Sequence, residues 1–164
     1  FGIYEPAAIA ASSVPQEVVI LGGESRTVSS VIPAAELTVV PAPGPSSPVP
    51  SGPLRSEAFG RVFGTRSGDK GGNANLGVFA RSNEAWAWLD QYLTEQRLRE
   101  LLPELGPLPL DRYRLPSLRS LNFVVYGLLE EGVAASTRQD AQAKSLGEWL
   151  RARVVELPES LIDD

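Results

Sequence analysis

The sequence contains no cysteine, no histidine and no methionine. Without cysteine, this chain has no disulfide, no thiolate nucleophile and no cysteine ligand for zinc or an iron–sulfur cluster. Without histidine, it has no Ser-His-Asp triad and no imidazole base. Oxygen ligands would suit Mg²⁺ or Ca²⁺, but Asp and Glu form no compact cluster, so we expect no metal and no cofactor. Any acid–base chemistry in this chain falls to Asp, Glu, Lys or Tyr.

Long apolar runs are absent too. No run approaches the roughly 20 residues that cross a bilayer, and the start lacks the basic region of a signal peptide. We therefore expect a cytoplasmic protein with no membrane partner. The net charge of -5 argues against nonspecific nucleic-acid binding, and 43% hydrophobic with 21% charged residues is typical of a globular domain. Because the chain begins at Phe1, we expect a fragment or processed product of a longer protein.

Proline and glycine divide the chain into segments. Residues 1–40 predict short strands, including a hairpin of Val18–Leu21 and Arg26–Val28, and we interpret them as the end of a larger preceding domain or an arm. Residues 41–56 are proline-rich and predict a semi-rigid linker, with a partner-binding motif as the alternative. We expect an α+β domain over residues 57–158 and a frayed tail over residues 159–164.

Periodicity predicts the elements of this domain. Strands are expected at four alternating or apolar runs, the last of them central in its sheet: Ala58–Thr65, Leu76–Ala80, Leu110–Leu115 and Leu121–Leu129. Val133–Thr137 predicts a further short strand. Ser82 or Asn83 and then Thr94 are expected to cap helices, and Asp140 to cap a last helix that ends at Pro158. Trp86 lies on an apolar helical stripe, whereas Trp88 lies off it and is expected to cover an interface.

One stretch combines small, polar and charged residues more densely than any other, namely Arg66-Ser67-Gly68-Asp69-Lys70-Gly71-Gly72-Asn73-Ala74-Asn75-Leu76-Gly77. Glycines bring backbone N–H groups close to a ligand, so a loop of this kind with two cations suits an anion such as a phosphate or carboxylate. It matches neither nucleotide motif, Gly-x-x-x-x-Gly-Lys-Ser/Thr or Gly-x-Gly-x-x-Gly. The alternative interpretation is a glycine-rich connection between strands whose charges are solvated.

This stretch, preceded by Gly60-Arg61-Val62, resembles the C-terminal domain of the AtuA-like family of acyclic terpene utilisation proteins. Segments downstream resemble the family in the same order: Ala85-Trp86-Ala87-Trp88-Leu89, Arg112-Tyr113-Arg114-Leu115-Pro116, Leu121-Asn122-Phe123-Val124-Val125, Gly132-Val133-Ala134-Ala135-Ser136 and Asp140-Ala141-Gln142-Ala143-Lys144-Ser145-Leu146-Gly147. The resemblance implies a small ferredoxin-like two-layer sandwich, with a mainly antiparallel sheet and two main helices on one face. It also implies a larger preceding domain and a role in catabolism of acyclic terpenes and branched acids as coenzyme A thioesters.

Two functions are consistent with these observations, and the sequence leaves open whether the chain is an enzyme. In the first, a polar pocket receives the phosphate or acyl carbonyl of an acyl-CoA-type ligand, with Asp69 or Lys70 as candidate catalytic proton carriers. The expected ligand-binding residues are Arg66, Gly68, Lys70, Gly71, Gly72, Asn73, Asn75, Asn122, Arg138 and Lys144. In the second, the domain is a non-catalytic assembly or regulatory domain that docks on its preceding domain or forms a homo-oligomer.

Two of these residues have a plainer alternative. Asn122 interrupts an apolar strand and could simply bond nearby backbone. Lys144 follows Asp140 by one helical turn, which predicts a surface ion pair. Arg138 and Lys144 would otherwise add positive charge to the anion pocket.

Overall fold

The computed structural model describes residue 7 and residues 9–28 and 47–162. The chain divides into two compact units, Phe1–Pro41 and Ala42–Asp164. In the first unit, strand β1 (Gln16–Val19) pairs antiparallel with β2 (Ser25–Val28), which confirms the predicted hairpin. Residues 1–40 predict two further short strands, at Val31–Ile32 and Leu37–Val40, which lie outside the described residues.

The second unit is built on a four-stranded antiparallel sheet in the order β4-β5-β7-β6. Its strands are β4 (Gly64–Lys70), β5 (Asn73–Phe79), β6 (Leu110–Leu115) and β7 (Ser120–Val125). β7 is an internal strand, as its apolar sequence predicts. The α+β class and the mainly antiparallel sheet predicted from the sequence are confirmed.

Alternation along the strands separates two faces of this sheet. One face carries apolar side chains that are fully buried, among them Ala74, Leu76, Val78, Leu121, Phe123 and Val125. The other face, which we call the open face, carries the alternate residues. Cross-strand register places them in rows, since residues opposite each other share a face: Arg66, Gly77, Asn122 and Tyr113 form one row, and Gly68, Asn75, Val124 and Asp111 the next.

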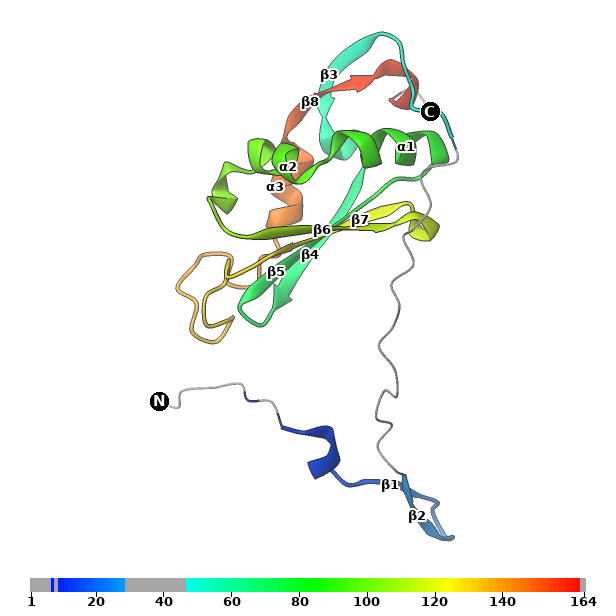
Figure 1. Ribbon diagram of the computed structural model, residues 1–164, viewed down its shortest axis with the longest axis vertical. Coiled ribbons are helices and arrows are strands. Elements are labelled where there is room, and N and C mark those ends of the chain that lie inside the picture. Colours follow the sequence, from blue (N-terminus) through cyan, green and yellow to red (C-terminus); the bar gives the residue numbers. More distant parts are fainter. Residues whose placement is uncertain (1–6, 8, 29–46, 163–164) are drawn as a thin grey trace. The chain divides into compact units, whose positions relative to one another are not determined.

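Three α-helices form the layer over the buried face (Figure 1). They are α1 (Asn83–Tyr92), α2 (Glu95–Leu101) and α3 (Leu146–Ala152). The Ser82 and Thr94 hydroxyls accept hydrogen bonds from the backbone N–H groups three residues ahead, so both predicted caps are confirmed. Short 3-10 helices lie at Ala11–Ser13, Phe59–Arg61, Pro103–Leu105, Pro116–Leu118 and Glu159–Leu161. No helix in the described ranges combines the length and apolar character needed to cross a membrane.

Trp88 lies in the core, so its predicted place at an interface is wrong. Its ring stacks on Phe63 at 5.5 Å and on Tyr92 at 4.1 Å between centroids, and only 7% of its surface is exposed. Trp86 is buried as predicted. Trp88 is buried although it lies off the apolar stripe of its helix, because Phe59 and Phe63 in the segment before β4 form a second apolar surface.

The segment predicted as a strand at Ala58–Thr65 instead turns through a 3-10 helix. Phe59 and Phe63 alternate with Arg61 in the sequence, but the Phe63 N–H bonds the Phe59 carbonyl and the rings pack at 4.7 Å. A four-residue spacing fits a helical turn as well as a strand face, and burial of both rings selects the turn. The predicted short strand at Val133–Thr137 is also wrong, because these residues lie in turns and irregular backbone.

A second, two-stranded sheet joins β3 (Leu54–Ala58) to β8 (Val154–Pro158), on the side of α1 away from the main sheet (Figure 1). β3 therefore begins inside the segment predicted as linker. The predicted continuation of the last helix to Pro158 is wrong, because Val155 and Leu157 are buried while Val154 is exposed, the alternation of a strand. Leu161 and Ile162 are buried too, so the described part of the predicted tail packs against the domain.

Asp90 joins α1 to the edge strand β6. Its carboxylate accepts hydrogen bonds from Arg112 at 2.8 Å and from Arg114 at 2.7 and 2.8 Å. Arg112 also donates to the carbonyls of Asp90 and Leu93. Burial raises the pKa of Asp90, but the hydrogen bonds and positive charges of the two arginines outweigh it and hold the pKa below its usual value.

We predict that Asp90→Asn lowers the free energy of unfolding by about 2 kcal/mol at pH 7, because two partly buried guanidinium groups lose their anion. Since the pKa of Asp90 is lower in the folded chain, its contribution is complete above about pH 4, the ordinary pKa of Asp, and is lost as the pH falls through the lowered value. Urea unfolding at pH 7 and at acid pH measures both effects.

Glu148→Gln is the matched control, because the Glu148 carboxylate meets Arg151 on an exposed surface. We expect it to change stability much less than Asp90→Asn. Equal losses from the two variants, or a loss from Asp90→Asn that persists unchanged at acid pH, would contradict the assignment.

Candidate functional site

The glycine-rich stretch lines a hollow on the open face of the sheet. The hollow has a volume of about 310 Å³ and is lined by Arg66, Ser67, Gly68, Asp69, Lys70, Asn75, Gly77, Asn122 and Lys144. Strands β4, β5 and β7 and the segment before α3 all contribute. Most of the residues predicted to bind a ligand are therefore gathered in one place, although they span nearly 80 positions of the sequence.

Two glycines form the floor of this hollow. Gly68 and Gly77 stand in adjacent rows of the open face, where neither places a side chain over the strands. A Cβ built on Gly68 would lie 3.0 Å from the Lys144 Nζ, closer than real Cβ atoms normally come. The missing side chain thus leaves the space that the Lys144 ammonium occupies.

Ser67 brings Lys144 to this position. Its hydroxyl donates to the Lys144 carbonyl at 3.0 Å and accepts from the Gly147 N–H at 2.9 Å. One side chain on the edge strand β4 therefore fixes the start of α3, and Lys144 can reach around the strand to the open face. The predicted ion pair of Lys144 with Asp140 is not formed: the Asp140 carboxylate accepts hydrogen bonds from the backbone N–H groups of Lys144 and Ser145.

These two hydrogen bonds also correct the predicted cap at Asp140. Helix α3 begins at Leu146, and Asp140 stabilises the turn that leads into it. Asp140 thus bonds the backbone of its own turn, as short polar side chains commonly do. The turn sets the position of the Lys144 backbone.

Asn75 and Asn122 form a side-chain amide pair beside the two glycines, since Asn75 is the cross-strand neighbour of Gly68 and Asn122 that of Gly77. The Asn75 side-chain amide donates to the Asn122 side-chain carbonyl at 2.8 Å, so Asn122 bonds a neighbouring side chain and not the backbone. An amide group carries two donor hydrogens and an acceptor oxygen. Whichever Asn donates within the pair, the other keeps a free NH₂ group that can bind an anion in the hollow.

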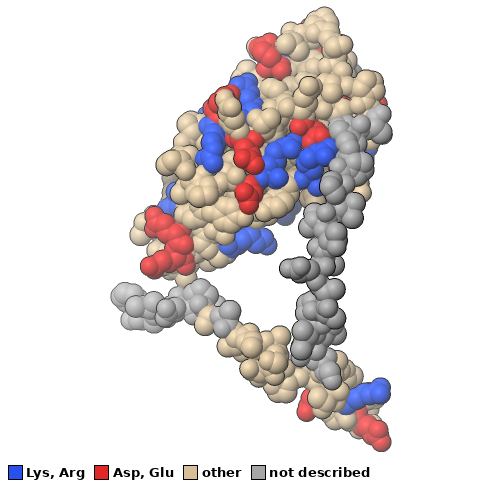
Figure 2. All heavy atoms as spheres, in the orientation of Figure 1, with Lys and Arg blue, Asp and Glu red and all other residues tan. Residues whose placement is uncertain are grey.

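The charge of the hollow is opposite to that of the chain. Arg66, Lys70 and Lys144 are exposed cations, and none forms an ion pair with any described residue. Asp69 is the one acid among the lining residues, and strand alternation turns it to the opposite side of β4 from Lys70. Elsewhere basic and acidic side chains are interspersed, as Figure 2 shows for one side of the molecule.

The tip of the β4–β5 hairpin has a structural role instead. The Gly72 carbonyl accepts a hydrogen bond from the Leu129 N–H, and Asn73 accepts one from the Gly127 N–H. A Cβ on Gly72 would lie 2.2 Å from the Glu130 carbonyl oxygen. Gly72 and Asn73 thus hold the hairpin against the turn after β7, and neither they nor Gly71 line the hollow.

Arg138 also lies apart from the predicted site. It borders a different depression, of about 640 Å³, together with Gln139, Asp140, Ser145 and Trp149. Ser67 and Gly77 are lining residues that the prediction left out. Both belong to the glycine-rich stretch, and strand alternation would have placed Gly77 on the face of Asn75 had the stretch been read as two strands.

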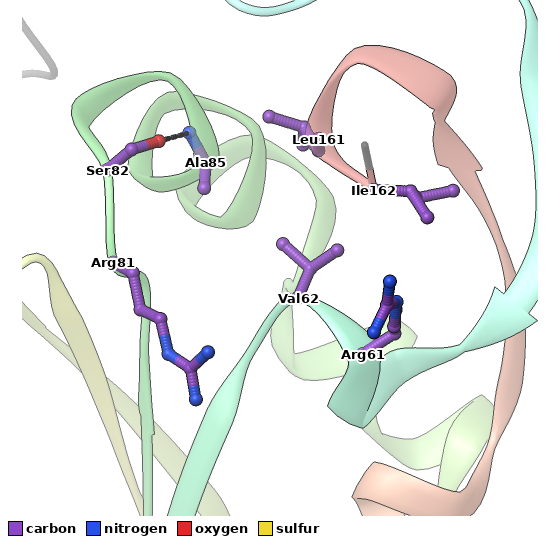
Figure 3. Close-up of a pocket in the computed structure, with 7 residues that line it drawn as sticks. All are labelled: Arg61, Val62, Arg81, Ser82, Ala85, Leu161 and Ile162. Carbon is purple, nitrogen blue, oxygen red and sulfur yellow. Dashed lines mark hydrogen bonds between the residues drawn. The ribbon is translucent and has the colours of Figure 1, made fainter. Parts of the chain in front are cut away.

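A further pocket lies at the other end of the domain, bounded by Arg61, Val62, Arg81, Ser82, Ala85, Leu161 and Ile162 (Figure 3). Its two arginines stand on either side of Val62, and their guanidinium groups do not converge on one point. Its single hydroxyl, on Ser82, is occupied as the cap of α1. The hollow on the open face is therefore the better candidate for an anion. Among the described residues no group of three or more Asp or Glu side chains is placed to hold a metal ion.

Comparison with known families places a match over most of the second unit: the family described as the AtuA ferredoxin-like domain matches residues 59–156. That range contains every residue that lines the hollow. No curated protein and no solved structure matches the chain.

We predict that Gly72→Ala lowers the free energy of unfolding by about 3 kcal/mol, because a Cβ there collides with the Glu130 backbone. Gly71→Ala is the control: Gly71 has a φ of 62° and open space around it, so a side chain costs only about 1 kcal/mol of backbone strain. Chemical denaturation measures both. The reverse order of the two losses would contradict the structural role of Gly72.

Proposed function

Because the chain belongs to the AtuA ferredoxin-like domain family, we propose that it supports or completes a site for an anionic ligand of the acyl-CoA type in the catabolism of acyclic terpenes and branched acids. The anion lies in the hollow on the open face. In this proposal a larger preceding domain completes the site.

One observation carries the proposal: three cations that form no ion pair with any described residue and an amide pair with a free NH₂ group line one hollow, which also contains two glycines. Cations on a protein surface normally spread out or pair with acids, because like charges repel one another. Arg66 supplies a planar donor group suited to phosphate, and Lys70 and Lys144 add compact charges. Gly68 leaves room for the Lys144 ammonium, and Gly77 leaves open space beside it for a bulky tetrahedral anion.

The arrangement favours binding over proton transfer. Asp69 and Lys70 are neighbours in sequence, but strand alternation turns their side chains to opposite sides of β4, and Lys70 forms no ion pair with any described residue. The hollow supplies donors and positive charge, which hold a phosphate or stabilise an oxyanion. A base, where the reaction needs one, then comes from outside this domain.

A non-catalytic role in assembly is the second candidate. Phe79 and Leu115 lie in one row at the end of the open face, with 38% and 41% of their surfaces exposed, and Leu118 close in sequence is 68% exposed. Exposed apolar side chains that gather at one place are typical of a docking surface. The preceding domain or a second copy of the chain would cover them. Trp88, which was expected to contribute, is buried and contributes nothing.

We predict that Lys144→Ala weakens binding of pyrophosphate and of coenzyme A about tenfold, because one charge-assisted hydrogen bond is lost. Isothermal titration calorimetry on the full chain measures both ligands. Arg138→Ala is the matched control: it removes an exposed cation from the other depression and should leave both affinities unchanged. Absence of binding to the unmodified chain, together with sedimentation as an oligomer, would favour assembly instead.

We further predict that Gly68→Ala weakens pyrophosphate binding at least as much as Lys144→Ala, because the added methyl group displaces the Lys144 ammonium. The methyl meets only the flexible end of a side chain, so stability should change little. Gly77→Ala is the comparison: its methyl group meets only the Arg66 carbonyl at an ordinary 3.6 Å and leaves Lys144 in place, so we expect a smaller loss of affinity than from Gly68→Ala. Equal, small effects of both variants would place the anion outside the hollow.

A further inference from the structure

The open face continues beyond the hollow, across β7 to the edge strand β6. The row that begins at Arg66 and Gly77 ends with Asn122 and Tyr113. The next row runs from Gly68 and Asn75 to Val124 and Asp111. With neighbouring strands about 4.8 Å apart, β4 and β6 are separated by roughly 14 Å. A ligand held by its anionic end over β4 therefore extends onto β6.

The β6 end of the face has a different chemistry. The Tyr113 and Tyr126 hydroxyls both donate to the Oδ2 of Asp111, at 3.1 and 2.8 Å. The Asp111 Oδ1 accepts no hydrogen bond from any described residue. Hydrogen bonding with Tyr113 and Asp111 raises the pKa of Tyr126, so this phenol stays protonated and keeps Oδ2 occupied. A free carboxylate oxygen beside an aromatic ring is thus held at the far end of the face.

We propose that the open face binds an adenine nucleotide, with phosphate in the hollow over Gly68 and the base against Tyr113 and Asp111. This inference rests on the proposed function and specifies which end of an acyl-CoA-type ligand the domain holds. It is the nucleotide end and not the thioester.

Two groups select the base. Tyr113 has 46% of its surface exposed, so a face of its ring is accessible for stacking. Asp111 Oδ1 has no hydrogen-bond donor among the described residues, so it can accept a hydrogen bond from the exocyclic amino group of adenine. An acyl chain offers neither a π face nor an amino donor, and a carboxylate repels any further anion.

The middle of the face suits the sugar. Val124 is half-buried and stands between Asn75 and Asp111 in the same row, where it gives an apolar contact. The Asn75–Asn122 pair beside it keeps one free NH₂ group for a ribose hydroxyl or a phosphate oxygen. Cation, amide, apolar and aromatic groups thus follow one another in the order phosphate, sugar and base.

The test compares ligands that carry parts of coenzyme A on the full chain by calorimetry. We expect adenosine 3′,5′-bisphosphate and ADP to bind at least tenfold more tightly than pyrophosphate, and pantetheine not to bind. Coenzyme A should bind about as tightly as the tighter of the two nucleotides, which also shows whether a free or a coenzyme-borne nucleotide fits better. Tyr113→Ala should remove most of the advantage of the nucleotides over pyrophosphate, and Tyr113→Phe should retain it because the ring remains.

Two variants complete the test. Asp111→Asn should also lower the ratio of nucleotide to pyrophosphate affinity, because a neutral amide is a weaker acceptor, whereas Leu118→Ala should leave the ratio unchanged. Pyrophosphate binding with no gain from adenosine would overturn the nucleotide assignment and leave the anion hollow intact. Tighter binding of an acyl-pantetheine than of ADP would assign the face to the thioester end instead. Failure of every probe would overturn the hollow as well.

Discussion

The hydroxyl of Ser67 is the contact on which the candidate site depends. It donates to the Lys144 carbonyl, just before α3, and accepts from the Gly147 N–H in the first turn of α3, 77 and 80 residues later in the chain. Edge strands normally present unpaired backbone and tolerate displacement. Here the edge strand β4 is tied to a helix start, and the third cation of the hollow arrives with that segment. The cationic charge of the hollow is therefore a product of tertiary structure and not of the glycine-rich stretch alone.

Local signals in the sequence predicted much of this fold. Ser82 and Thr94 cap their helices, Pro116 follows the end of β6, and the apolar β7 is internal to its sheet. Each of these depends on residues a few positions apart, which a single sequence contains. The same holds for Arg66, Lys70 and Asn75, which lie on neighbouring strands joined by a tight turn. The position of Lys144 over Gly68 depends on a distant hydroxyl, so no local pattern in the sequence could establish it.

The wrong predictions share a physical cause. Phe59 and Phe63 fit a strand face and a helical turn equally well, and Trp88 lies off the stripe of its helix. Burial determined the conformation at Phe59 and Phe63 and the position of Trp88, because these side chains contact a surface formed by a segment remote in sequence. Val154–Pro158 is the converse case: it continues a helical pattern, yet pairing with β3 makes it a strand. Periodicity states which residues share a face, whereas the partner of that face comes from the rest of the chain.

The net negative charge of the chain limits how the hollow can attract an anion. A chain with net charge -5 repels anions at long range, so a site for one must act at short range through contacts that salt and distance do not screen away. Gly68 and Gly77 make that possible, because Gly68 leaves room for the Lys144 ammonium and Gly77 leaves open space where an anion can contact the cations directly. They also contribute no side chain that could discriminate between ligands. Selection between ligands must then come from the groups around the floor. On this face those groups lie toward β6, where Asp111 offers a hydrogen-bond acceptor and Tyr113 an aromatic ring in place of positive charge.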